Sequence, residues 1–160
     1  MITELVKGLG VTLKHLFKKP TTVEYPFEKL QYSDRYRAVH GLRRHDDGLE
    51  RCVCCGLCGI ACPADAIYME AAENTETERH SHGERYAQVY KIHMYRCIFC
   101  GFCEEACPED AIYLTKDTQA VVTDRDQMVW DKEKILKHGE LFPKKPDVPV
   151  DPPEGTPSVH

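Results

Sequence analysis

A run of closely spaced cysteines occurs twice in this chain. The first copy, CVCCGLCGIACPADAIYM, covers residues 52–69, and the second, CIFCGFCEEACPEDAIYL, covers residues 97–114. Both copies contain the spacing C-x2-C-x2-C-x3-C-P, and both continue into Asp-Ala-Ile-Tyr. A repeat of this kind encodes the same supersecondary unit twice. We therefore expect an α+β domain with pseudo-twofold symmetry, in which each half has a cysteine loop, a short helical turn and a strand.

Nine cysteines among 160 residues indicate either a disulfide framework or metal binding. Disulfide frameworks are typical of exported proteins. The N-terminal segment predicts neither a signal peptide nor a membrane-spanning helix, because Glu4, Lys7 and Lys14 interrupt its apolar residues. An odd number of cysteines would also leave one thiol unpaired. Metal binding in a reducing compartment is the better interpretation.

The cysteine spacing is typical of a bacterial ferredoxin that holds [4Fe-4S] clusters. Three thiolates two residues apart can wrap one cluster, and Gly56 and Gly101 permit the tight backbone that this requires. The fourth cysteine of each run, followed by proline, is expected to face the cluster of the other repeat. The predicted ligands are Cys52, Cys55, Cys58 and Cys107 for the first cluster, and Cys97, Cys100, Cys103 and Cys62 for the second. Zinc fits less well, because zinc sites usually use two separated cysteine pairs or histidines.

The ninth cysteine, Cys54, has no counterpart in the second copy, where Phe99 stands at the equivalent position. We favour a thiol that lies beside the first cluster without binding it. A spare ligand and a redox-sensitive thiol are the alternatives.

Four histidines near the cysteine runs are candidate functional residues. His80 and His82 belong to a polar loop and are expected to be exposed to solvent. For His40 and His93 the default interpretation is a structural role, and the alternative is a proton role linked to redox change. The same segment between the runs is expected to end as a strand with one face formed by Tyr86, Gln88, Tyr90 and Ile92.

The flanking segments divide the rest of the chain. Residues 1–19 predict an amphipathic helix, which either packs on this protein's own core or lies on a membrane surface or membrane subunit. Its apolar stripe contains Ile2, Leu5, Val6, Leu9, Leu13, Leu16 and Phe17. Residues 20–50 predict an extended connector, residues 51–116 the two-cluster domain, and residues 117–142 a segment that packs on partners. Residues 143–160 hold six of the ten prolines and predict a solvated or partner-bound tail.

The formal net charge of −5 is unevenly distributed. Residues 1–51 carry ten Lys and Arg against seven Asp and Glu, a balance of +3, and residues 52–160 carry eleven against nineteen, a balance of −8. Different neighbours are therefore expected for the two parts. No basic cluster with interleaved aromatic residues is present, so we do not expect nucleic acid as a partner. Nor is there a phosphate loop, a nucleophile elbow or a dinucleotide fingerprint, so no catalytic residue is assigned.

The flanks also carry a family resemblance. The stretches TTVEYPFEK, RYRAVHGLRR, GLERCVCCGLC, YRCIFCGFCEEACPEDAIY and MVWDKEKIL together resemble subunit I of proton-translocating NADH–quinone oxidoreductase, respiratory complex I. The resemblance implies an electron-relay subunit with two [4Fe-4S] clusters and no complete active site of its own. Its electrons would pass along the peripheral arm toward the terminal cluster and quinone, in an enzyme that couples this transfer to proton translocation.

The same resemblance implies where the chain resides and what it contacts. It would be a peripheral subunit on the cytoplasmic face of the bacterial inner membrane. The implied partners are the iron–sulfur subunits of the peripheral arm and the membrane subunit at the quinone site, with the N-terminal helix against the membrane arm. An equivalent subunit of a related membrane hydrogenase and a free two-cluster ferredoxin remain as alternatives.

Overall fold

The computed structural model describes residues 2–28, 30, 32–33, 35–118 and 121–143, and it divides between residues 33 and 34 into two compact units. The predicted proline-rich tail lies outside the described residues, apart from its first residue, Pro143. The two units are described separately.

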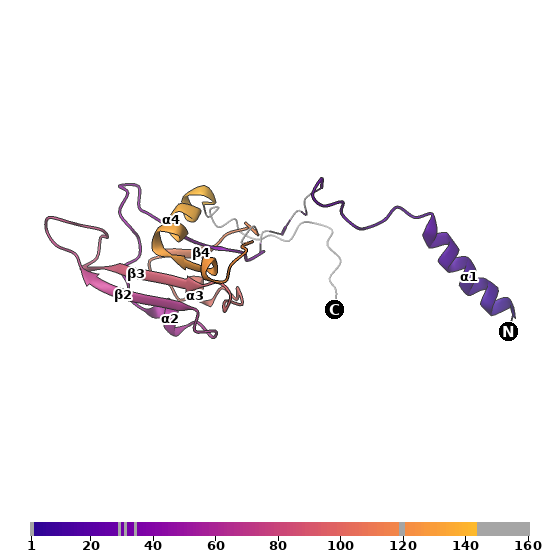
Figure 1. Ribbon diagram of the computed structural model, residues 1–160, viewed down its shortest axis with the longest axis horizontal. Helices are drawn as coiled ribbons and strands as arrows, with labels where there is room; N and C mark the ends of the chain where they lie inside the picture. Colours follow the sequence, from indigo (N-terminus) through magenta and orange to yellow (C-terminus); the bar gives the residue numbers. More distant parts are fainter. Residues whose placement is uncertain (1, 29, 31, 34, 119–120, 144–160) are drawn as a thin grey trace. The chain divides into compact units, whose positions relative to one another are not determined.

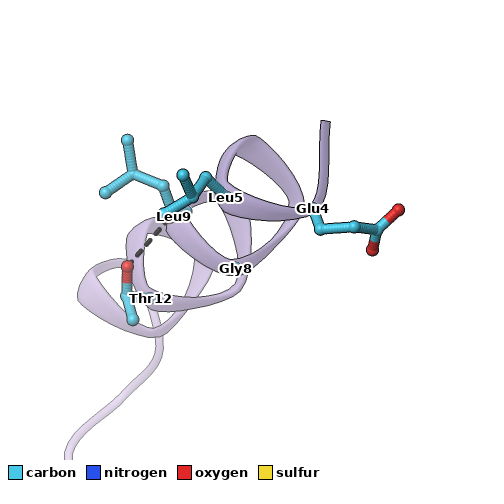
Figure 2. Close-up of a pocket in the computed structure, with 5 residues that line it drawn as sticks. All are labelled: Glu4, Leu5, Gly8, Leu9 and Thr12. Carbon is cyan, nitrogen blue, oxygen red and sulfur yellow. Dashed lines mark hydrogen bonds between the residues drawn. The ribbon is translucent and has the colours of Figure 1, made fainter. Parts of the chain in front are cut away.

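The first unit contains the predicted amphipathic helix, α1 (Ile2–Leu16), which ends three residues earlier than expected. None of the residues Ile2–Leu16 is buried. Figure 2 shows Leu5 and Leu9 beside one another along a shallow hollow on the helix, with Glu4 pointing away from them. Within the described residues, no helix has the length and apolar character needed to cross a membrane.

The second unit contains two small antiparallel sheets and short helices (Figure 1), which confirms the predicted α+β class. The two-stranded sheet pairs β1 with β4, and the three-stranded sheet has the order β2-β3-β5. The elements are β1 (His40–Leu42), α2 (Leu57–Ile60), β2 (Ile67–Glu73), β3 (Arg85–His93), α3 (Phe102–Glu105), β4 (Ile112–Leu114), the 3-10 turn η1 (Asp126–Met128), β5 (Val129–Asp131) and α4 (Lys132–Leu141).

The two cysteine runs fold alike. Each run contains a four-residue helix, α2 or α3. The residue before each helix is a glycine in the left-handed region, with φ of 85° at Gly56 and 88° at Gly101. An L side chain is strained there, and glycine is not. Corresponding backbone hydrogen bonds also match: Cys62 N–H donates to Gly59 O at 3.2 Å, and Cys107 N–H donates to Glu104 O at 3.3 Å. The local geometry therefore follows the sequence repeat.

The strand expected between the runs exists, but the predicted face is wrong in its first half. Tyr90 and Ile92 share one face as predicted, and this face is buried, whereas Gln88 is exposed and Ala87 takes the inward position. The cause is a register shift: Glu70 of β2 pairs with Val89, while the next residue, Ala71, pairs with Ala87. An extra residue on one strand is a β-bulge, which reverses the alternation of side chains beyond it.

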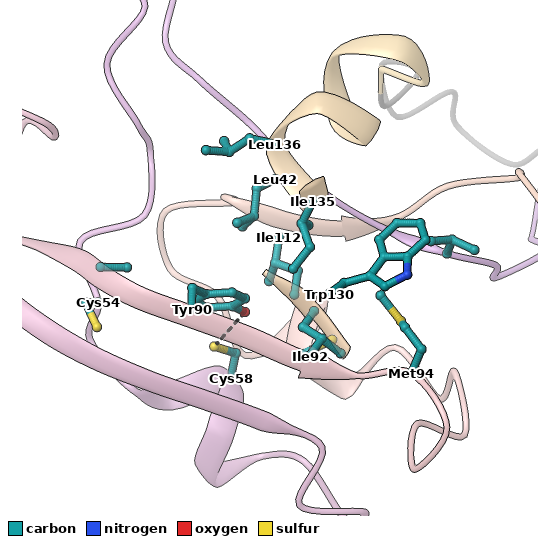
Figure 3. Close-up of a cluster of buried hydrophobic side chains, with 13 residues drawn as sticks. Leu42, Cys54, Cys58, Tyr90, Ile92, Met94, Ile112, Trp130, Ile135 and Leu136 are labelled. Carbon is teal, nitrogen blue, oxygen red and sulfur yellow. Dashed lines mark hydrogen bonds between the residues drawn. The ribbon is translucent and has the colours of Figure 1, made fainter. Parts of the chain in front are cut away.

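The C-terminal segment packs on this chain's own core, and its packing on partner subunits stays a prediction. Trp130, Ile135 and Leu136 are at most 6% exposed, and Figure 3 shows them grouped with core side chains from the sheets. Helix α4 packs against β1, so residues 40–42 of the expected connector form part of the domain. The start of α4 is fixed by Asp131, whose side chain accepts a hydrogen bond from Lys134 N–H at 2.9 Å.

Helix α4 approaches β1 so closely that a glycine is required at their contact. A Cβ on Gly139 would collide with the carbonyl oxygen of Leu42 and would lie 3.0 Å from its nitrogen. Both atoms belong to the backbone, so neither can move aside without shifting the strand.

Gly139→Ala is therefore expected to lower the free energy of unfolding of the full chain by about 1–3 kcal/mol. The check is a lower midpoint of thermal unfolding. The matched control is Gly59→Ala in α2, where the nearest atom to the new Cβ is the flexible Met69 Cε at 3.6 Å. Equal midpoints for the two variants would contradict the proposed close contact.

Candidate iron–sulfur centres

The first cavity in the domain brings together cysteines from both runs. Its walls include Cys52, Cys55 and Cys58 of the first run and Cys107 of the second. The space between its walls measures ≈ 350 Å³, including the part open to solvent. Its remaining walls are largely apolar and include Leu42, Met69 and Ile112.

The second cavity has the reciprocal composition. Cys97, Cys100 and Cys103 of the second run line it together with Cys62 of the first, around a space of ≈ 320 Å³ measured in the same way. Each cavity thus contains the four cysteines that the sequence assigns to one cluster. Across the described ranges, no three His, Cys, Asp or Glu side chains lie close enough to share a single metal ion. Ligation of clusters by these cysteines stays a prediction.

The backbone around the cysteines is turned inward at equivalent positions of the two runs. Cys54 and Phe99 both have φ of 53°, and Asp65 and Asp110 have φ of 47° and 48°. These four residues are non-glycine residues in the left-handed region, which is uncommon and costs free energy. The same unusual conformation at matching positions indicates that the loop shape is required at both sites.

These loops direct backbone N–H groups at the sulfur atoms. Cys62 Sγ accepts a hydrogen bond from Ala66 N–H at 3.4 Å, and Cys107 Sγ accepts one from Ala111 N–H at 3.3 Å. Such donors stabilise a thiolate, which is the form of cysteine that binds iron. Cysteines from both runs in each cavity, with N–H groups pointing at Cys62 Sγ and Cys107 Sγ, fit an iron–sulfur cluster.

Burial raises the pKa of several of these thiols. The pKa of Cys52 is raised to about 12, chiefly by burial and also by the neighbouring Cys58, and the pKa of Cys103 is raised to about 12 in the same way. Burial also raises the pKa of Cys58 and of Cys97. Thiolates gathered in one cavity repel each other and lack solvation, so positively charged iron is the counter-charge that would hold them deprotonated.

Two buried side chains lie near cluster-facing sulfurs. Tyr90 Oη lies 3.5 Å from Cys58 Sγ, a contact that Figure 3 marks with a dashed line. His40 Nε2 lies 3.8 Å from Cys97 Sγ. The sequence predicted Tyr90 only as a residue on one face of a strand and gave His40 no partner. Neither contact has a local sequence signal, because the partners are 32 and 57 residues apart in the chain.

Besides His40, a second residue of the expected connector supports the second cavity. Arg37 Nη1 donates to the carbonyl oxygen of Cys100 at 2.6 Å, and Arg37 also pairs with Glu105 at 3.6 Å. A Cβ on Gly101 would lie 2.8 Å from Arg37 Nε, so the guanidinium packs directly over this glycine. The stretch that contains Arg37 and His40 therefore covers the second cysteine loop.

Cys54 is buried and also lines the first cavity, and burial raises the pKa of its thiol. Its position is compatible both with a bystander and with a spare ligand, so the preference for a bystander stays a prediction. Among the histidines, His80 and His82 are exposed, as predicted. His82 Nε2 lies 2.8 Å from Asp47 Oδ2, and His93 is half-buried.

The crossed arrangement makes a specific prediction for Cys62→Ala. The variant should lose the cluster of Cys97, Cys100 and Cys103, and iron should fall from about eight to about four atoms per chain. The electron paramagnetic resonance spectrum of its remaining cluster should match that of Cys97→Ala, since both variants would keep the first cluster. A match to Cys52→Ala would contradict the crossed assignment.

The matched control for this experiment is Cys54→Ala, which removes a cysteine from the same run and is expected to leave both clusters in place. The comparison is best repeated with Cys54→Ala as the background, because a spare thiol beside the first cavity could replace a lost ligand there.

Comparisons with known proteins agree with this chemistry. Residues 51–111 match the family model described as a 4Fe-4S dicluster domain. The chain is also similar to a chain in the structure of the membrane-bound sulfane sulfur reductase, an archaeal respiratory membrane complex, with 30% sequence identity and a TM-score of 0.53. That match covers 86% of this chain and 69% of the other. Residues 51–111 of this chain therefore form a 4Fe-4S dicluster domain, which is a ferredoxin-like, electron-carrying iron–sulfur domain.

Proposed function

We propose that this chain is the electron-relay subunit I of an NADH–quinone oxidoreductase of the complex I type, with two [4Fe-4S] clusters. The observation that carries the proposal is the pair of cavities, each of which brings the three predicted ligands of one run together with one cysteine of the other run. Cys52, Cys55, Cys58 and Cys107 would hold one cluster, and Cys97, Cys100, Cys103 and Cys62 the other. Such clusters supply one-electron transfer at potentials that the surrounding protein sets.

The residues of the domain suit a relay. Because each run would contribute ligands to both clusters, the two sites share one rigid framework, and α2 packs against α3 between them. Apolar walls limit water around the first site, and Cys58 and Cys103 are themselves buried. Low water access and a fixed geometry reduce the reorganisation that accompanies each change of charge.

The N-terminal unit supports a place in a membrane complex. Helix α1 exposes an apolar stripe that no described residue covers: Ile2, Leu5, Leu9 and Leu16 are each more than 70% exposed. A stripe of this size on a lone helix indicates a docking surface. We propose that it lies against the membrane arm near the quinone site, on the cytoplasmic face of the bacterial inner membrane, with the peripheral iron–sulfur subunits as further partners.

A second candidate follows from the similarity to a chain of the archaeal membrane-bound sulfane sulfur reductase. In that case the chain would be the equivalent subunit of a related membrane hydrogenase or sulfur-reducing complex, with the same relay chemistry and a different terminal reaction. A diffusing ferredoxin is the weaker alternative, because a soluble carrier would have no partner for the exposed stripe of α1.

The deciding experiment is purification of the native complex through this chain. We expect about eight iron and about eight acid-labile sulfide atoms per chain, together with a flavoprotein that oxidises NADH and passes electrons to quinone. Recovery with hydrogenase or sulfur-reducing activity in place of NADH oxidation would overturn the complex I assignment in favour of the second candidate. Stoichiometric zinc without sulfide would refute the relay function itself.

The docking role of α1 can be tested with two similar substitutions on opposite sides of the helix. Leu9→Glu places a charge in the apolar stripe. Docking would bury Leu9, so losing this side chain is expected to weaken binding by about 1.5–3 kcal/mol. The fraction of the chain that sediments with membranes should fall accordingly. Val11→Glu is the matched control, because Val11 is also exposed, at 60%, but lies outside the stripe. Equal release of both variants, with unchanged iron content, would contradict docking through the stripe.

A further inference from the structure

The two cavities differ in the side chains that contact their cysteines, although the loops repeat. In the second cavity, His40 Nε2 lies 3.8 Å from Cys97 Sγ. In the first cavity, Tyr90 Oη lies 3.5 Å from Cys58 Sγ. Cys97 corresponds to Cys52 in the repeat, not to Cys58, so the two contacts are at non-equivalent positions. Both side chains also come from outside the repeated cysteine loops.

His40 is held firmly where it meets the sulfur. It is 1% exposed and lies in β1, paired with Leu114 of β4. Its carbonyl oxygen accepts a hydrogen bond from His138 Nδ1 at 3.1 Å, and its ring lies 5.8 Å from the Phe99 ring, centroid to centroid. A side chain fixed by a sheet and by packing keeps one orientation toward its partner.

The chemistry of the contact shows which of its two atoms, His40 Nε2 or Cys97 Sγ, carries the hydrogen. A cysteine that binds iron is a thiolate, which can only accept a hydrogen bond, so the hydrogen must be on His40 Nε2. A neutral imidazole with its hydrogen on Nε2 has no hydrogen on Nδ1. The other nitrogen, Nδ1, is buried without a hydrogen-bond partner, which agrees with a bare lone pair there. A buried N–H at that position would be left unsatisfied, at a higher cost.

We propose that His40 sets the reduction potential of the second cluster by donating a hydrogen bond from Nε2 to Cys97 Sγ. One electron added to a cluster increases the negative charge on the ligand sulfurs, and a donor stabilises that charge. The hydrogen bond therefore raises the potential, and the proton stays on His40 throughout. Tyr90 acts in the same sense on the first cluster through Cys58. The inference rests on the ligation in the proposed function.

The test uses the full chain with its clusters loaded, in a redox titration followed by electron paramagnetic resonance. His40→Leu removes the donor and should shift one reduction wave to lower potential. Tyr90→Phe should shift the other wave and serves as the matched control. His40→Gln, whose amide nitrogen can occupy the place of Nε2, should return the wave toward its original potential. Loaded His40→Leu protein with both waves unchanged, or both variants shifting the same wave, would overturn the proposal.

A measurement on the unaltered protein decides the matter if His40→Leu fails to fold. Histidine labelled with 15N should give a hyperfine coupling to the reduced clusters, and the coupling should persist in the labelled His93→Gln variant, which removes the nearby alternative. No coupling in loaded protein would refute the hydrogen bond. Iron and sulfide analysis separates the two hypotheses: protein without clusters contradicts the proposed function, whereas loaded protein with unmoved potentials contradicts only the role of His40.

Discussion

The exchange of one cysteine between the two halves is the constraint on which the rest of the domain depends. Each cavity takes its fourth cysteine, Cys62 or Cys107, from the opposite run. Neither half can complete its own cavity, so the sheets and α4 must hold the halves in one relative position. The ion pair of Lys132 with the buried Glu50, 2.9 Å apart, contributes to this, because Lys132 Nζ also donates to the Ala87 carbonyl at 2.8 Å and so joins α4 to β3. Removing Lys132 would leave the buried Glu50 carboxylate without its counter-charge, which would lower the stability of the fold.

The grouping of the cysteines could be predicted from the sequence because it depends on a short spacing pattern that occurs twice. Spacing within each run determines which sulfurs can face inward, and the glycines at 56 and 101 mark where the backbone must adopt positive φ. The remaining features depend on contacts between distant segments. The sequence of β3 contains no residue pattern that predicts the bulge near Gln88. The packing of α4 in the core depends on β1, which lies about a hundred residues earlier in the chain. His40 could be singled out as a histidine, but its sulfur partner could not.

The same comparison explains the segments on either side of the cysteine runs. Residues 20–50 show no periodicity, which suggested a connector, yet His40–Leu42 form a strand because β4 offers an antiparallel partner. Helix α4 has too few large apolar residues to show an apolar face in the sequence. Its packing rests on the buried side chains of Ile135 and Leu136, which is enough for a short helix that lies against a sheet. Sequence patterns reveal long amphipathic elements, such as α1, more readily than short ones that depend on their neighbours.

A repeated unit alone would give two identical redox sites, and two identical sites give an electron no preferred direction. In this domain the non-repeated segments supply the difference. Residues 37 and 40 cover the second cysteine loop, where Arg37 donates to the Cys100 carbonyl and His40 meets Cys97. The first site has a tyrosine from β3 at a different cysteine. Arg37 is half exposed and paired with Glu105, so the clearer difference is the donor, which meets Cys97 at one site and the non-equivalent Cys58 at the other. The segment before the repeat, which contains Arg37 and His40, therefore makes the surroundings of the two cavities unequal.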